Sequence, residues 1–179
     1  MKKCIALVLC AVMLLACVAA VADESMGILK VNKAFDIKYA PLPDDYAISI
    51  FQQNDMTIIA NIKSSQANLP QMGLIIAFSD AWAETNTMNE VSEEDMQAIE
   101  DSFLEEYPDL SFETRETAAG TKLLVVKAPS GQDAYVYTIY KGHEIEIHLF
   151  PGTEQEELDD ADIERVVAFL SGIEFVPVE

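Results

Sequence analysis

The stretch that decides the fold is residues 133–150, which read DAYVYTIYKGHEIEIHLF. Apolar and polar side chains alternate through both halves, as they do in strands that turn one face toward a core. Lys141 and Gly142 divide the halves, and a dipeptide of this kind is typical of a tight hairpin turn. The pattern therefore predicts an antiparallel hairpin in which Val136 lies opposite Ile147 on an apolar face.

The second face of this hairpin carries the candidate binding residues. The predicted register sets two tyrosines on the first strand against a histidine and two glutamates on the second, at a repeat of about 7 Å along each strand. This candidate surface consists of Tyr135, Tyr137, Glu144, Glu146 and His148. We expect it to contact a small ligand or a partner protein unless a helix covers it, and a solvated sheet face is the alternative. His143, next to the turn, is expected to be an exposed loop residue.

Imidazole and carboxylate groups on one face also suit zinc or manganese. No fourth ligand is identifiable in the sequence, so we assign neither a metal site nor a cofactor. The acidic segment 154–162 lacks the ligand order and the central glycine of an EF-hand, and we interpret it as the solvated start of a helix. A divalent-metal-binding protein remains an alternative function.

The strand pattern continues upstream of the hairpin. Residues 110–117 and 122–127 alternate with period two and extend the hairpin into a meander. Residues 46–51 and 56–62 have the composition of half-buried strands. Residues 73–78 form a continuous apolar run, which predicts a central strand covered on both faces.

Two helices are predicted, one before the meander and one after it. Ser92 begins the first, because Asp95 three residues later approximates a capping box. Apolar residues then recur at helical spacing until a proline stops the helix: Met96, Ile99, Phe103, Leu104 and Tyr107. Residues 163–170 carry the same spacing in the second helix, and Gly172 is expected to end it in a left-handed conformation. Residues 173–176 are predicted as a short final strand.

The first 22 residues follow the pattern of a secretory signal peptide. Two lysines precede an apolar stretch, and Ala20 and Ala22 offer the small side chains that signal peptidase needs for a cut before Asp23. The stretch is shorter than the ~20 residues that span a bilayer, so no transmembrane helix is expected in the mature form. The four residues that end at Cys17 resemble a bacterial lipobox, and a lipid anchor on that cysteine is the alternative. We expect a secreted or extracytoplasmic protein.

Composition narrows the range of partners. All three cysteines lie within the first 17 residues, so the mature chain has no disulfides and depends on its core for stability. The chain has 11 basic and 31 acidic residues, and loss of Lys2 and Lys3 with the signal changes its net charge from −20 to −22. A polyanion is repelled by nucleic acid and by anionic lipid, so neither is expected as a partner. The negative charge either keeps the protein soluble or attracts a cationic partner. We expect the protein to be a monomer.

The sequence contains none of the common catalytic signatures. Nucleophile elbow, phosphate-binding loop and zinc-protease motifs are missing, and we assign no catalytic residue. We therefore favour a non-enzymatic binding or assembly module, with an exported hydrolase using carboxylate catalysis as the alternative. Trp82, Tyr39 and Tyr46 are either interface anchors or residues that pack over the edge of the core.

Residues 39–46, YAPLPDDY, form a Tyr-x-Pro-type turn that ends in an aromatic residue. An opening strand precedes this turn, and strands, a helix, a long antiparallel meander and a C-terminal helix follow it. Over residues 34–176 this order resembles the PsbP-like superfamily, which includes the photosystem II extrinsic protein, the Ran nucleotide-release factor and small exported bacterial proteins. The resemblance implies an α/β/α sandwich around an antiparallel sheet, and binding or assembly rather than catalysis. It implies no particular functional residue.

Together these patterns predict an α+β fold, an antiparallel β-sheet with helices packed on it. The expected organisation is a signal peptide at residues 1–22, a short polar lead-in at 23–33 and a single domain at 34–179. The mature chain of residues 23–179 is long enough to bury a substantial core in one domain.

Overall fold

The computed structural model describes residues 27–31, 35–40, 42 and 44–178. The predicted export signal, with Cys17, Ala20, Ala22 and Asp23, lies outside the described residues. Within the described part of the chain, no helix combines the length and the apolar character needed to cross a membrane.

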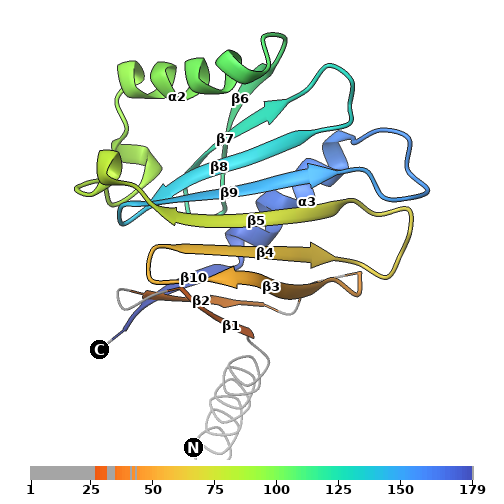
Figure 1. Ribbon diagram of the computed structural model, residues 1–179, viewed down its shortest axis with the longest axis horizontal. Coiled ribbons are helices and arrows are strands. Elements are labelled where there is room, and N and C mark those ends of the chain that lie inside the picture. Colours follow the sequence, from red (N-terminus) through yellow and green to blue (C-terminus); the bar gives the residue numbers. More distant parts are fainter. Residues whose placement is uncertain (1–26, 32–34, 41, 43, 179) are drawn as a thin grey trace, which may run out of the picture.

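The described residues form ten strands and two α-helices, which Figure 1 labels in chain order. Their bounds are β1 (Gly27–Lys30), β2 (Phe35–Tyr39), β3 (Ala47–Gln53), β4 (Thr57–Lys63), β5 (Gln71–Phe78), the 3-10 helices η1 (Asp80–Trp82) and η2 (Met88–Glu90), α2 (Glu93–Glu106), β6 (Ser111–Glu116), β7 (Lys122–Lys127), β8 (Ala134–Tyr140), β9 (His143–Phe150), α3 (Asp160–Ser171) and β10 (Ile173–Pro177).

The strands form two sheets. Seven of them make one antiparallel sheet in the order β3-β4-β5-β9-β8-β7-β6, and β1, β2 and β10 make a second antiparallel sheet (Figure 1). The predicted α+β class with an antiparallel sheet is confirmed, whereas the second sheet was not predicted. Strand β1 lies inside the segment expected to be a polar lead-in, and its Leu29 and the following Val31 are buried in the core.

The predicted hairpin is confirmed as β8 and β9. Val136 pairs with Ile147 and Tyr137 with Glu146, in the predicted register. Lys141 and Gly142 have φ angles of 45° and 75°, the left-handed conformations that a tight hairpin turn requires. Each strand of the hairpin therefore presents one set of side chains to the core and the other set to the opposite face.

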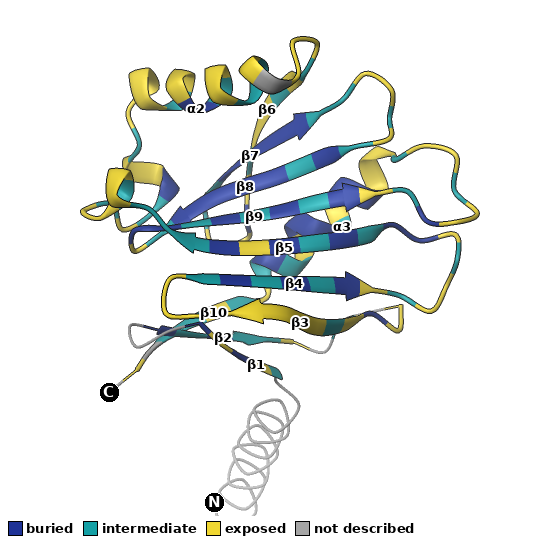
Figure 2. Ribbon diagram, in the orientation of Figure 1, coloured by how far each residue is buried: buried dark blue, intermediate teal, exposed yellow. Residues whose placement is uncertain are grey.

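The core lies on one face of the seven-stranded sheet, here called the inner face. Val136 and Ile147 meet Ile163 and Val166 of α3 there, and Phe35 of the small sheet packs into the same cluster. Figure 2 shows the resulting line of buried residues along the central strands. Asp159 caps α3 through reciprocal bonds with Asp162, so the acidic segment does lead into a helix start as predicted, although Asp162 itself is buried.

Helix α2 lies over part of the opposite, outer face. Ser92 caps it by accepting a hydrogen bond from the Asp95 backbone N–H, as predicted. Its Ile99 is buried against Leu124 and Val126 of β7, but Tyr107 at its end is 48% exposed. The predicted apolar stripe is therefore only partly core, since Met96 and Phe103 pack against this cluster while partly exposed.

Three predictions about individual positions are wrong. His143 is only 3% exposed, because β9 begins there and directs the side chain to the inner face, with ring contacts to Phe35 at 4.9 Å and Phe78 at 5.4 Å. Ile75 of β5 is 37% exposed, so this central strand is covered on one face only. Gly172 has φ −92°, because the chain runs from α3 into β10 without the reversal that a left-handed residue provides.

Candidate functional site

The structure brings the five predicted surface residues together on the outer face. Tyr137 is buried beneath α2, whereas the two glutamates and His148 on β9 are half-buried. The rings of Tyr135 and His148 stack at 4.0 Å with an angle of 17° between their planes, and Phe150 lies 3.9 Å from His148. A helix therefore covers the β8 side of the predicted surface and leaves the β9 side accessible.

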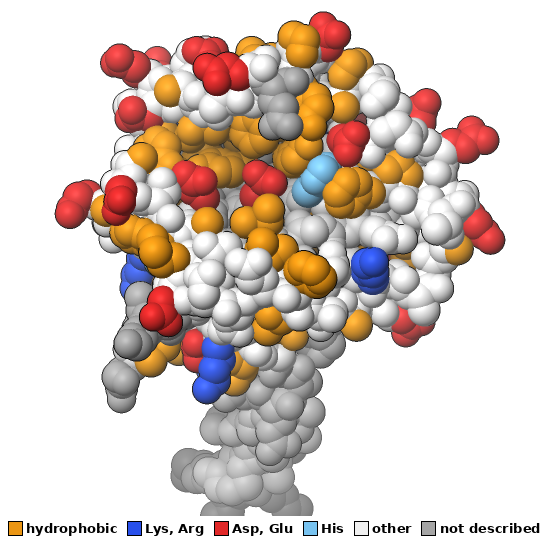
Figure 3. Space-filling view, in the orientation of Figure 1, with side chains coloured by type: hydrophobic (Ala, Val, Ile, Leu, Met, Phe, Trp, Pro, Cys, Tyr) orange, Lys and Arg blue, Asp and Glu red, His pale blue; other side chains and the backbone are white. Residues whose placement is uncertain are grey.

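A cavity of about 410 Å³ lies between α2 and this face, and we call it the acidic hollow. Figure 3 shows apolar side chains gathered in a recess below the helix, with acidic groups and a histidine along its edge. The residues that line the acidic hollow are Trp82, Asp95, Ala98, Ile99, Ser102, Phe103, Tyr137, Glu144 and Glu146.

Trp82 is held at one end of the acidic hollow by the loop after β5. Backbone hydrogen bonds from Lys141 N to Asn86 O (2.9 Å) and from Gly142 N to Thr85 O (3.0 Å) fasten this loop to the hairpin turn. The indole Nε1–H then donates to Glu144 Oε1 at 3.0 Å. This bond orients the carboxylate and leaves the indole ring as one wall of the hollow.

Tyr137 contributes a neutral phenol to the same cavity. Burial raises the pKa of its hydroxyl, and the neighbouring Glu144 carboxylate raises that pKa further. The phenol therefore stays protonated at any physiological pH, and the negative charge of the hollow comes from its carboxylates.

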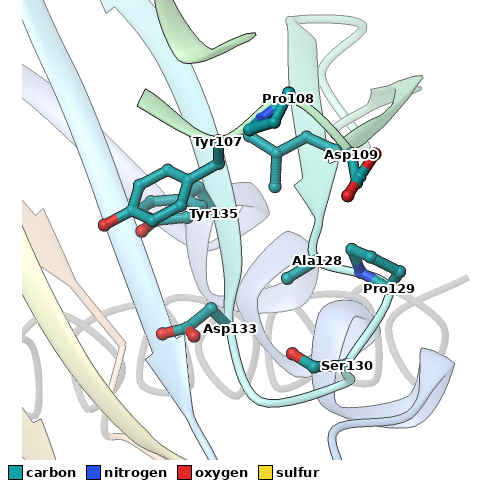
Figure 4. Close-up of a pocket in the computed structure, with 9 residues that line it drawn as sticks. Tyr107, Pro108, Asp109, Ala128, Pro129, Ser130, Asp133 and Tyr135 are labelled. Carbon is teal, nitrogen blue, oxygen red and sulfur yellow. The ribbon is translucent and has the colours of Figure 1, made fainter. Parts of the chain in front are cut away.

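A second cavity, of about 240 Å³, lies near the C-terminal end of α2, and we call it the tyrosine hollow. Its lining residues are Tyr107, Pro108, Asp109, Leu110, Ala128, Pro129, Ser130, Asp133 and Tyr135. Figure 4 shows the Tyr107 and Tyr135 rings on one side of this hollow, Pro129 on the other and Asp133 below the rings. Asp133 Oδ1 also contacts His148 Nε2 at 3.0 Å, which ties this hollow to the aromatic stack on β9.

Phe103 of α2 stands between the two hollows. Its ring centroid lies 5.6 Å from that of Tyr135, which lines the tyrosine hollow, and 6.3 Å from that of Tyr137, which lines the acidic hollow. The two tyrosines are successive residues on one face of β8, so the hollows are neighbours along that strand.

The electrostatic character of both hollows is negative. Neither lining includes a lysine or an arginine. Five carboxylates line the two hollows: Asp95, Glu144 and Glu146 in the acidic hollow, and Asp109 and Asp133 in the tyrosine hollow. Burial lowers the pKa of His148, against the opposing influence of Asp133, so the imidazole is neutral at pH 7. The linings of both hollows therefore carry a net negative charge.

Residues that the sequence singled out elsewhere have other roles. Tyr46 is buried, and its hydroxyl donates to the Pro70 carbonyl at 2.7 Å. Tyr39 packs edge-on against Phe169. Both tyrosines thus belong to the core and its edge, while Trp82 lines a cavity. In the described ranges, no group of three or more His, Cys, Asp or Glu side chains is arranged to hold a metal ion.

Sequence reasoning found the β8–β9 half of the site and missed the half on α2. The lining residues Asp95, Ser102 and Phe103 belong to a helix whose position over the sheet no local pattern specifies. No protein-family model matches the chain, and a comparison with curated proteins finds no match. Function is therefore inferred from the two hollows themselves.

Proposed function

We propose that this protein is a non-enzymatic binding module that acts outside the cytoplasmic membrane and takes a positively charged ligand in the acidic hollow beneath α2. The observation that carries the proposal is the acidic hollow, in which Trp82, Phe103 and Tyr137 form aromatic walls around three carboxylates with no basic residue among them. A cavity with apolar walls and a few convergent polar groups is the usual form of a small-ligand site.

The chemistry of the walls favours a cation that has an apolar part. The face of an indole or phenol attracts a cation through its quadrupole, and a partly desolvated carboxylate strengthens that attraction. A purely inorganic cation would leave the aromatic walls unused. An anionic or neutral ligand would bring no positive charge to offset the desolvation of the carboxylates of Glu144 and Glu146.

The location is proposed from the first 22 residues, whose pattern is that of a secretory signal with cleavage before Asp23. Lipidation of Cys17 would tether the same module to the envelope instead. A relation to the PsbP-like superfamily is supported by the antiparallel sheet with α2 on one face and α3 on the other, and it agrees with a binding role.

Trp82 provides a direct test, because it is the only tryptophan of the chain and lines the acidic hollow. The mature domain, residues 23–179, is titrated with 2-phenylethylammonium and with the neutral 2-phenylethanol while tryptophan emission is recorded. We expect a saturable change with the cation that is weakened by salt. The paired substitution Glu144→Gln and Glu146→Gln should abolish it. Glu154→Gln with Glu156→Gln removes the same charge from an exposed loop and should not.

A second candidate, an exported hydrolase, is favoured by the presence of Glu144 and Glu146 in one cavity. Successive residues on one face of a strand lie about 7 Å apart. That repeat falls within the ~6.5–9.5 Å that separates the carboxyl groups of inverting glycosidases. Turnover of aryl glycosides by the mature domain, lost in Glu144→Gln and in Glu146→Gln, would support the enzyme over the binding module.

A further inference from the structure

We infer that the ligand is an extended, basic polypeptide segment whose alternate side chains enter the acidic hollow beneath α2 and the tyrosine hollow at its C-terminal end. This inference rests on the proposed function and adds the class of partner. The observations behind it are the size of the two hollows, their spacing and the charge of α2, which lines the acidic hollow and ends beside the tyrosine hollow.

The tyrosine hollow is too small to enclose a whole drug-sized ligand, and both hollows are large enough for a single side chain. Their volumes are about 410 Å³ and about 240 Å³. The smaller volume lies below the ~300–1,000 Å³ range of pockets that enclose a drug-sized molecule, and the larger lies in the lower part of that range. Two such hollows separated by the single ring of Phe103 can instead accept two side chains of one continuous chain.

The distance between the two hollows matches the distance between alternate side chains of an extended peptide. Tyr137 and Tyr135 line one hollow each and are two residues apart on β8, which sets a repeat of about 7 Å. A peptide in extended conformation projects every second side chain to one side at the same repeat. The distance along α2 from Asp95 to Tyr107 is about 18 Å at 1.5 Å per residue, room for about five extended residues.

The negative charge of the two hollows favours lysine or arginine as the side chains that enter them. The long aliphatic stem of either residue suits the aromatic walls, while the charged end reaches the carboxylates at the rim. Helix α2 adds to this, because it has three acidic residues in its first turn and no basic residue in its last turn. The partial negative charge of its C-terminus therefore faces the tyrosine hollow without a compensating cation. A second copy of the chain would bring another strongly negative molecule and is opposed by repulsion.

The test compares three probes on the mature domain by Trp82 emission: the peptides Ser-Lys-Ser-Lys-Ser and Ser-Lys-Lys-Ser-Ser, each capped at both ends, and 2-phenylethylammonium. The two peptides have the same composition and charge and differ only in spacing. We expect the alternating peptide to bind about tenfold or more tightly than the clustered one, because it fills both hollows at once. Tyr107→Ala, at a position 48% exposed, should remove most of that difference, and a thermal midpoint well above the titration temperature will show that the variant is folded.

Equal affinity for the two peptides, or an unchanged preference in Tyr107→Ala, would overturn the inference. In that case 2-phenylethylammonium would still bind the wild-type domain if the proposed function holds. Failure of all three probes would overturn the proposed function as well, so the two failures are distinguishable.

Discussion

Phe103→Ala is the substitution that bears most directly on how α2 is held over the sheet. The Phe103 ring is half-buried and lies 5.6 Å from Tyr135, 6.3 Å from Tyr137 and 6.5 Å from Phe112, measured between centroids. It is thus a principal contact between the helix and strands β6 and β8. Removing it should loosen the helix and join the two hollows into one.

The expected cost follows from this burial. Replacing a fully buried phenylalanine by alanine costs about 3–5 kcal/mol, and a half-buried ring should cost roughly half of that, about 2 kcal/mol. For a domain of this size, about 1 kcal/mol shifts the thermal midpoint by about 2–4 °C. We therefore expect Phe103→Ala to melt about 4–8 °C below the wild type.

Thermal unfolding followed by near-ultraviolet circular dichroism measures this shift. Glu105→Ala is the matched control, because Glu105 lies on the exposed side of the same helix and its loss should change the free energy of unfolding by less than about 0.5 kcal/mol. A melting temperature for Phe103→Ala that equals that of Glu105→Ala would refute the packing of α2 described above, and with it the walls of both hollows.

Three further predictions concern the pH dependence of stability, the space around two glycines and the cleavage of the N-terminal segment. Because burial lowers the pKa of His148 below the ordinary imidazole value of 6.5, the unfolded chain binds the proton more readily. The free energy of unfolding should therefore fall as pH drops from 8 toward 5.5. Chemical denaturation should show a smaller fall for His148→Asn over the same pH range, and an equal fall in the two proteins would contradict this prediction. Gly152→Ala should destabilise by about 2–3 kcal/mol, since an added Cβ would collide with the carbonyl oxygens of Ala67 and Leu69. Gly73→Ala, with open space around the new Cβ, should be near neutral, and similar denaturation midpoints for the two glycine variants would disprove the placement of Gly152. Intact-mass measurement of the protein from its native host should give a free N-terminus at Asp23 if the proposed signal is cleaved, whereas a lipidated Cys17 would show that the module is tethered.

Local periodicity was sufficient for the elements that contact their sequence neighbours. The β8–β9 hairpin followed from alternation and from Lys141-Gly142, and the start of α2 followed from Ser92 and Asp95. In both cases the deciding interactions join residues close together in the chain, so a short window of sequence contains them.

Long-range contacts account for what local patterns could not predict. Strand β2 pairs with β1 on one side and with β10, from the other end of the chain, on the other. His143 is buried by Phe35 and Phe78 from two separate segments. Strand alternation places His143 on the same face as Ile145 and so predicts burial, whereas the position of His143 beside the turn predicts exposure.

The candidate site also combines residues that local patterns could place with residues that only long-range contacts bring there. Glu144, Glu146 and Tyr137 could be placed on one face from register alone, whereas Trp82 reaches Glu144 across 62 residues of chain. Its approach depends on the loop after β5 pairing with the hairpin turn, and that pairing is set by backbone groups rather than by side-chain type.

The measurement that tests the central claim most directly is the titration of the mature domain with 2-phenylethylammonium and 2-phenylethanol, read by the emission of Trp82. The claim predicts saturable binding of the cation that weakens with added salt and disappears in the Glu144→Gln, Glu146→Gln pair. Equal responses to the cation and the neutral alcohol, or an unchanged response in that pair, would contradict it.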